Sequence, residues 1–282
     1  MYKYALSFYY LYMSRLKQPI DMLSWILIFL IPPFFLGWYG TPLLFGEYLL
    51  RFSLGFMAFY TLYEVGYLEN DIITTQKESS ATLRLPFKEQ EKITKGYSQI
   101  VGFRLLLVLF FLLLLRGVVG SWEALSAFLL LLLVSRVVFW FHNHLRNRGN
   151  IVTYFLLASL KYGMVFTLNG TQEEGLFLLG VLLLFPLPRT LEHMARKRYG
   201  FKRYALRMGS YDCFRIVYYG GFVLIILIPL LSSEMSGRWW LLEGFGVYFL
   251  LFRLGAYGLL RRGYYKRDSL KMQDRFHKRE VC

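Results

Sequence analysis

The stretch Tyr67-Leu68-Glu69-Asn70-Asp71-Ile72-Ile73-Thr74-Thr75-Gln76-Lys77-Glu78 decides the fold, because it joins the end of a long apolar segment to a basic loop. Glu64, Asp71 and Glu78 are spaced by seven residues, so they share one face if a helix continues through this stretch. Polar and aromatic side chains lie beside them: Tyr60, Tyr63, Tyr67 and Thr74. Ionisable groups at a membrane boundary are costly unless they pair, bind metal or face an aqueous cavity. The stretch therefore predicts a functional site. The alternative is that its acids neutralise nearby Lys and Arg at a helix end.

The composition predicts an all-α integral membrane protein. Of the 282 residues, 56% are hydrophobic and 19% aromatic, and the mean hydropathy is +0.40. Soluble domains are less apolar, at about 45–50%. The net charge of +15 suggests nucleic acid at first. However, the basic residues alternate with apolar segments too long for a soluble core, so the positive-inside rule explains them better.

The apolar segments predict a polytopic helical bundle of about eight transmembrane helices. Residues 1–20 mix aromatics with three basic residues and are typical of an interfacial helix. The predicted spans are 22–38, with a kink at Pro32-Pro33, then 44–70, 98–116, 122–141, 151–169, 173–189, 211–232 and 239–260. Each is long enough to cross a hydrocarbon core of about 30 Å.

The distribution of Lys and Arg over the loops predicts the orientation. One side carries the basic segments 1–20, 70–97, 142–149, 189–207 and 261–282, whereas the short loops on the other side contain only Arg238. Both termini are therefore expected in the cytoplasm. We expect one transmembrane domain over residues 1–260 and a basic cytoplasmic tail over 261–282. The absence of a cleavable presequence slightly favours a prokaryotic inner membrane.

Several cations interrupt the predicted spans. By this topology Arg104, Arg136, Arg215 and Arg253 lie in the cytoplasmic halves of their helices. They are either snorkelling side chains or the wall of a cavity for an anionic group. Lys161 lies near the middle of its span and needs a partner, for which Glu64 is the candidate.

Two later loops repeat the basic theme. His142 and His144 are two residues apart and point to different faces of a helix, so they do not make a zinc pair. Arg146 and Arg148 in the same loop are good phosphate ligands, because guanidinium groups bind phosphate oxygens bidentately. The later segment 186–200 places Glu192 at the entry to a strongly basic stretch.

Taken together, these loops resemble the UbiA superfamily of intramembrane prenyltransferases. The family has an N-D-x-x-D-x-x-x-D motif after its second helix, which Asn70, Asp71 and Glu78 match in spacing, and a D-x-x-x-D motif after its sixth, whose first acid is matched by Glu192. Further stretches resemble its other elements: Thr82-Leu83-Arg84-Leu85-Pro86, Leu145-Arg146 with Gly149-Asn150, and Gly200 with Gly209. The resemblance covers residues 15–210. It departs at Thr74 and Arg196, which stand where the motifs have acids, and in having eight spans where nine are typical.

The resemblance implies a site in which Mg²⁺ bridges acidic residues and a prenyl diphosphate. Asp71, Glu78 and Glu192 would be the catalytic and metal-binding residues. The substrate-binding residues would be Asn70, Tyr67, Arg84, Arg146, Arg148, Asn150, Arg196, Lys197 and Arg198. Fewer carboxylates could still hold one ion, because Mg²⁺ usually keeps several waters. Arg196 could instead supply fixed positive charge to the leaving phosphate.

The expected activity is transfer of a prenyl or polyprenyl group from a prenyl diphosphate to a small acceptor, at the cytoplasmic face of the lipid bilayer. Two alternatives stay open. One is a transferase of the same fold that moves a phosphoribosyl or other sugar group to a polyprenyl phosphate. The other is a non-catalytic lipid-binding protein that kept the fold after losing two acids. A fold-level analogy does not by itself establish the reaction.

Overall fold

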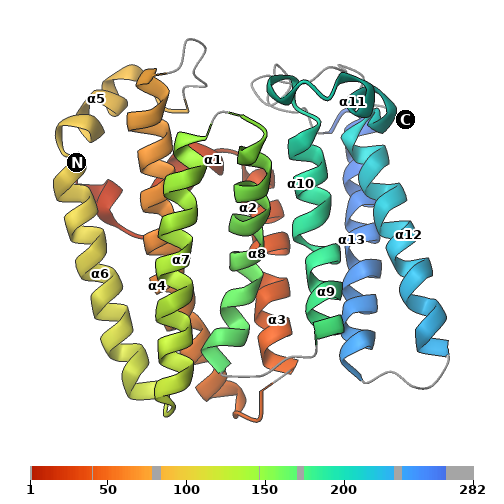
Figure 1. Ribbon diagram of the computed structural model, residues 1–282, viewed down its shortest axis with the longest axis horizontal. Coiled ribbons are helices and arrows are strands. Elements are labelled where there is room, and N and C mark those ends of the chain that lie inside the picture. The colour runs from red at the N-terminus through yellow and green to blue at the C-terminus, as the bar shows by residue number, and fades with distance from the viewer. Residues whose placement is uncertain are drawn as a thin grey trace. The chain divides into compact units, whose positions relative to one another are not determined.

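The computed structural model describes residues 2–39, 41–77, 84–145, 147–169, 175–231 and 237–264, and every regular element among them is a helix (Figure 1). By length and composition, four helices can cross a membrane: Pro19–Tyr39, Tyr97–Val118, Trp122–His144 and Gly149–Asn169. Two bent pairs, Gly175–Leu184 with Pro186–Met194 and Lys202–Met208 with Tyr211–Leu227, raise the number to six. The chain is therefore an all-α, multi-pass membrane protein, as predicted.

Two further long helices fall outside this set. Helix α4 (Phe45–Leu68) has 24 residues and helix α13 (Gly237–Arg261) has 25. Both coincide with predicted spans, but each contains charged residues such as Glu64 and Arg253. The number of eight spans and the cytoplasmic orientation of the termini stay predictions.

The helices form two compact units. The first unit comprises Met1–Arg146 and Leu160–Gln172, and the second comprises Asn147–Ser159 and Glu173–Cys282. The first contains η1 (Tyr2–Ala5), α1 (Tyr9–Arg15), α2 (Pro19–Trp25), η2 (Ile26–Leu30), α3 (Ile31–Tyr39), α4, η3 (Glu69–Thr74), η4 (Thr75–Lys77), α5 (Phe87–Lys95), α6 (Tyr97–Val118) and α7 (Trp122–His144). The second contains α9 (Gly175–Leu184), α10 (Pro186–Met194), η5 (Lys197–Tyr199), α11 (Lys202–Met208), α12 (Tyr211–Leu231) and α13. Helix α8 (Gly149–Asn169) contributes to both.

The prolines of the first span have a local consequence. Pro32 has no N–H to donate to the carbonyl of Ile28, four residues earlier. In the structure the Tyr162 hydroxyl donates a hydrogen bond to this carbonyl, at 3.0 Å. The residues just before the prolines, Ile26–Leu30, form a π-helical turn. The span is thus irregular next to the predicted kink, and a neighbouring helix satisfies a backbone group that proline leaves unpaired.

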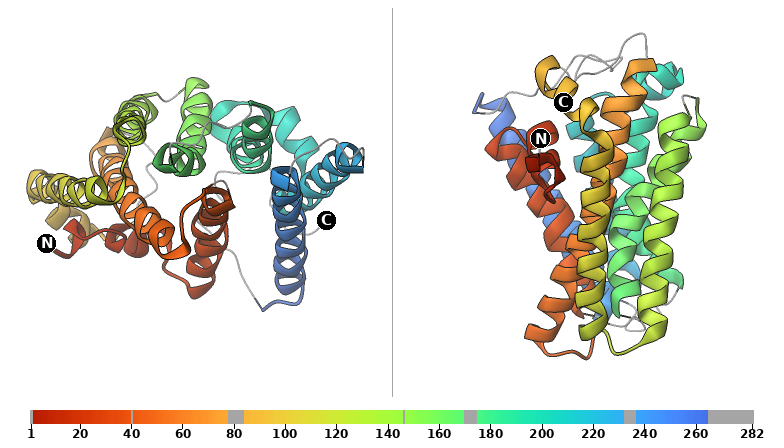
Figure 2. Two further views of the ribbon diagram at one scale, coloured as in Figure 1. Left: turned by 90° about the horizontal axis from the view of Figure 1, so that it is seen from below. Right: turned by 90° about the vertical axis from the view of Figure 1, so that its left-hand side faces the viewer.

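Helix α4 is the centre of the first unit. It packs along α6 and α7 and also contacts α1 and α3, and Figure 2 shows α4 and α6 running alongside each other. Two glycines allow close approach. A Cβ on Gly55 would collide with Leu168 of α8, and one on Gly66 would collide with the ring of Phe139 of α7. Small residues at such contacts are typical of helix packing in membranes, where close backbone approach replaces hydrophobic driving force.

We expect Gly66→Ala to destabilise the protein by about 1–3 kcal/mol, because the added methyl group must displace the Phe139 ring. Gly102→Ala is the matched control, since Gly102 is exposed on α6 and has no neighbouring atom within 4 Å of its added Cβ. Thermal unfolding in a non-ionic detergent measures both variants. Equal unfolding temperatures for the two would contradict the packing described.

Candidate functional site

The N-terminal segment is docked onto α4 by one carboxylate. Both oxygens of Glu64 accept backbone hydrogen bonds from this segment, Oε2 from Phe8 at 2.9 Å and Oε1 from Leu11 at 2.6 Å. These amides lie at the start of α1, which has no side-chain cap of its own. A carboxylate at a helix N-terminus satisfies unpaired N–H groups and complements the helix dipole. Glu64 therefore caps α1 from a different helix.

Arg104 of α6 completes the docking. Its guanidinium donates to Glu64 Oε2 at 2.7 Å, and both side chains are fully buried. The remaining N–H groups donate to the backbone carbonyls of Tyr4, Leu6 and Thr61 at 2.8–3.3 Å. One side of this segment is buried, with Tyr10 at 0% and Leu11 at 2% exposure, whereas Tyr12 is 49% exposed.

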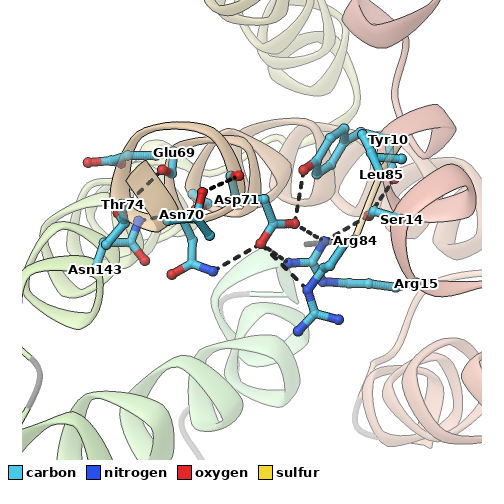
Figure 3. A network of polar contacts seen from close by, with 12 residues as sticks. Tyr10, Ser14, Arg15, Glu69, Asn70, Asp71, Thr74, Arg84, Leu85 and Asn143 are labelled. Carbon is cyan, nitrogen blue, oxygen red and sulfur yellow. Dashed lines mark hydrogen bonds and ion pairs between the residues drawn. The ribbon is translucent and has the colours of Figure 1, made fainter. Parts of the chain in front are cut away.

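The docked segment brings Tyr10 and Arg15 to Asp71. Arg15 approaches the carboxylate with both terminal nitrogens, Nη1 at 2.8 Å from Oδ2 and Nη2 at 3.2 Å from Oδ1. The Tyr10 hydroxyl donates at 2.9 Å and the Asn70 amide at 3.0 Å. Arg84 Nε lies 3.5 Å from Oδ1. Figure 3 shows Asp71 between Tyr10 and Asn70, with the two guanidinium groups on one side of its carboxylate.

This arrangement, which we call the Asp71 cluster (Tyr10, Arg15, Asn70, Asp71 and Arg84), keeps the carboxylate charged. Burial alone would raise the pKa of Asp71, but the guanidinium groups of Arg15 and Arg84 outweigh it and hold the pKa below its usual value. The pKa of the Tyr10 hydroxyl is raised, first by burial and then by the Asp71 charge. Two guanidinium groups, those of Arg15 and Arg84, therefore face one carboxylate. Arg84 is the more accessible cation, at 36% side-chain exposure against 15% for Arg15.

Tyr67 links the Asp71 cluster to a buried amine. The Arg15 guanidinium lies 3.9 Å from the centre of the Tyr67 ring, and the Tyr67 hydroxyl lies 3.3 Å from Lys161 Nζ. The same ammonium lies 4.5 Å from the Phe29 ring and 4.6 Å from the Tyr63 ring. Lys161 is therefore held by aromatic rings, and the proposed pairing of Lys161 with Glu64 is wrong, because Glu64 binds Arg104 and the N-terminal segment.

The helix does continue through the opening stretch, but not as a regular α-helix. Residues Glu69–Thr74 are π-helical, a form that is rare and frequent at functional sites. Glu69 pairs with Arg136 of α7 at 3.1 Å, and the Thr74 hydroxyl bonds back to the Glu69 carbonyl at 3.3 Å. Thr74, where the resembled motif has an acid, thus closes a local turn. Glu78 lies outside the described residues.

In the second unit Glu192 is also bound by arginine. Arg215 of α12 donates two hydrogen bonds to it, Nε to Oε1 at 2.5 Å and Nη2 to Oε2 at 2.6 Å. Arg189 lies 4.0 Å from Oε2. Arg215 also reaches Asp212 at 3.5 Å. Among the described residues, Arg215 and Arg189 are thus the ion-pair partners of Glu192, and the role expected of Arg196 toward a leaving phosphate stays a prediction.

The other predicted residues of this unit form a separate cluster. Asn150 Oδ1 lies 3.1 Å from His193 Nε2, 2.5 Å from the Tyr199 hydroxyl and 3.3 Å from Arg198 Nη2. Arg148 donates to the Tyr199 carbonyl at 3.4 Å. His193 and Tyr199 were not predicted; a His one residue after Glu192 was the only signal. Arg196 is half-buried and Lys197 exposed at the start of η5, and Arg146 lies outside the described residues.

The described carboxylates do not fit a resident Mg²⁺ in this arrangement. Both oxygens of Asp71 and both of Glu192 accept from guanidinium groups. Over the described ranges no group of three or more His, Cys, Asp or Glu side chains is placed to hold a metal. Mg²⁺ needs free oxygen ligands in near-octahedral geometry, so binding at Asp71 requires that Arg15 move away.

Comparison of the chain with protein-family models, with curated proteins and with solved structures finds no match. The resemblance to the UbiA superfamily therefore stays a prediction.

We expect Asp71→Asn to lower the free energy of unfolding at pH 7 by about 3–5 kcal/mol, because it leaves the buried Arg15 charge uncompensated. Since the folded-state pKa of Asp71 is lowered, its stabilisation is complete above the unfolded value of about 3.9 and is lost as the pH falls through the folded value. We therefore expect the free energy of unfolding, measured in detergent from pH 6 to pH 3, to fall less steeply in Asp71→Asn than in the wild-type protein. Glu91→Gln, which breaks an exposed pair with Lys95, is the control and should change little. Equal acid sensitivity of Asp71→Asn and wild type would contradict the charged state assigned to Asp71.

Proposed function

We propose that the protein is a membrane-embedded transferase that binds a prenyl diphosphate at the Asp71 cluster and passes the prenyl group to a small acceptor. The observation that carries the proposal is the convergence of Arg15 and Arg84 on one carboxylate. Guanidinium groups bind phosphate oxygens bidentately, so two of them side by side suit an anionic substrate. In our proposal this end of α4 faces the cytoplasm.

The interior of the first unit is lined with aromatic rings below the Asp71 cluster. Aromatic rings continue from Tyr67 through Tyr63 and Phe59 to Tyr60, with centroids 5.2–5.5 Å apart at each step. Ring faces attract cations, and because Lys161 already lies against Tyr63 and Tyr67, we assign the stabilisation of the allylic cation to Phe59 and Tyr60. The ammonium of Lys161 at Tyr67 adds a positive charge toward the diphosphate end.

The proposed reaction breaks the bond between the allylic carbon and the diphosphate oxygen, and the electron pair leaves with the diphosphate. The guanidinium groups of Arg15 and Arg84 stabilise the negative charge that develops there, as preorganised charges do at other sites. The nucleophilic atom of the acceptor then bonds to the allylic carbon and loses its proton to water. The proposed step uses no Mg²⁺, because arginine side chains occupy the carboxylates of Asp71 and Glu192.

A non-catalytic protein that binds phosphorylated isoprenoids is the second candidate. It is favoured because Asp71 and Glu192 are ion-paired with arginines, whereas the resemblance to the UbiA superfamily predicts that they bind metal. Both candidates need the same anion site, so they are separated by turnover. A catalyst transfers a radiolabelled prenyl group to acceptors in a membrane extract, whereas a binding protein retains the prenyl diphosphate intact.

We expect Arg84→Gln to weaken the binding of farnesyl thiodiphosphate to the purified protein by about 10-fold or more, because a charge-assisted hydrogen bond contributes about 1.5–3 kcal/mol. This variant keeps the Arg15–Asp71 pair, so the fold should survive. Lys95→Gln removes an exposed cation on the nearby α5 and should bind as the wild type does. Isothermal titration in non-ionic detergent measures both. Unchanged affinity in Arg84→Gln would argue against the Asp71 cluster as the diphosphate site.

A further inference from the structure

Arg253 is a buried cation whose charge is not paired. Its residue is 6% exposed, and in the part of the chain that the structure describes it donates no hydrogen bond and forms no ion pair. Its Nε is buried without a partner, and the guanidinium carbon lies 4.8 Å from the centre of the ring of the adjacent residue Phe252. Three other arginines in the predicted spans bind a carboxylate: Arg104 binds Glu64, Arg136 binds Glu69 and Arg215 binds Glu192.

The packing of α12 against α13 places Arg253 near Arg215. These helices run antiparallel along each other (Figure 1), and the rings of Tyr219 and Phe249 stack between them at 5.2 Å. Arg215 is four residues before Tyr219, and Arg253 is four residues after Phe249. Because the helices are antiparallel, one turn back along α12 and one turn forward along α13 lead in the same direction. Arg215 and Arg253 therefore lie at the same level along the helix pair. Arg253 also interacts electrostatically with Arg189.

Among the described residues, the guanidinium groups of this region outnumber the carboxylates. Arg189, Arg215 and Arg253 bring three guanidinium charges, against the two carboxylates of Glu192 and Asp212, both of which Arg215 contacts. Glu243, another buried acid of α13, lies ten residues from Arg253, or about 15 Å along the helix. Burying a charge without a partner is strongly unfavourable. A bound anion would offset the positive charge of this group.

We propose that Arg253, together with Arg189 and Arg215, binds an oxyanion of the phosphate class in the second unit. The Arg253 guanidinium, whose Nε has no partner, carries the parallel N–H groups that phosphate oxygens accept, while Arg215 stays on Glu192. The same chemistry is found in a phospholipid headgroup and in free phosphate or diphosphate. This site uses residues of the second unit only and does not depend on the function proposed for the Asp71 cluster.

The test is thermal unfolding of the purified protein in non-ionic detergent with and without sodium pyrophosphate, at constant ionic strength. Arg84→Gln serves as the background, so that binding at the Asp71 cluster is weakened. In this background pyrophosphate should raise the unfolding temperature by at least about 2 °C. Adding Arg253→Met should abolish the rise. Adding Arg261→Gln, an exposed arginine on the same helix, should leave it intact.

A second arm identifies the source of the anion. In this arm the protein is placed in nanodiscs of phosphatidylcholine with 30% phosphatidylglycerol, and no pyrophosphate is added. If the unfolding temperature rises only in nanodiscs, and only when Arg253 is present, the site binds a lipid headgroup. Arg253→Met without anion should unfold at the wild-type temperature or above it, because the unpaired charge is gone. If that variant does not fold, Arg253→Lys serves instead. It keeps the positive charge but lacks the two parallel N–H groups of the guanidinium, and it should bind pyrophosphate about 10-fold more weakly. The proposal is overturned if neither source raises the unfolding temperature, or if Arg253→Met responds as its background does.

Discussion

The buried ion pair between Glu64 and Arg104 is the interaction on which the first unit depends. One carboxylate caps α1, and one guanidinium holds three backbone carbonyls, two of them in the N-terminal segment. Such a pair is tolerated in a low-dielectric interior only when its remaining hydrogen-bonding groups are also satisfied. That condition is met here by the backbone of residues 4–11, so the docking of the segment and the burial of the pair require each other.

The consequence reaches the candidate site. Tyr10 and Arg15 reach Asp71 because α1 is capped by Glu64, which lies two turns of α4 before Asp71. The structure thus uses a buried pair to position a second, more accessible one, in which Arg84 adds a further positive charge. A network of this kind holds the N-terminal segment in one conformation and so fixes the positions of its positive charges. Fixed charge is what an anionic substrate needs, because it requires no reorganisation when the substrate binds.

Much of the fold could be predicted from the sequence, because long apolar segments report helices directly. The first predicted span, 22–38, lies within the helix Pro19–Tyr39, and the prolines in it do mark an irregular helix. The prominence of the stretch around Asp71 was also visible, since acids in an apolar context are rare. The partners of these acids were not visible. Arg15 and Arg104 lie 56 and 40 residues from the acids they bind, and periodicity says which face a residue occupies but not what meets it. For the same reason Lys161 was paired with the wrong partner, and only the structure shows its aromatic surroundings.

The central claim is that Glu64 holds the N-terminal segment in place, and hydrogen–deuterium exchange of residues 2–15 tests it most directly. In the wild-type protein the amides of Phe8 and Leu11 donate to Glu64, so peptides from this segment should exchange as slowly as those from α4. In Glu64→Gln the segment should exchange at least about 100-fold faster, while α7 stays protected. Rapid exchange of the segment in the wild type, or equal protection in Glu64→Gln, would contradict the account.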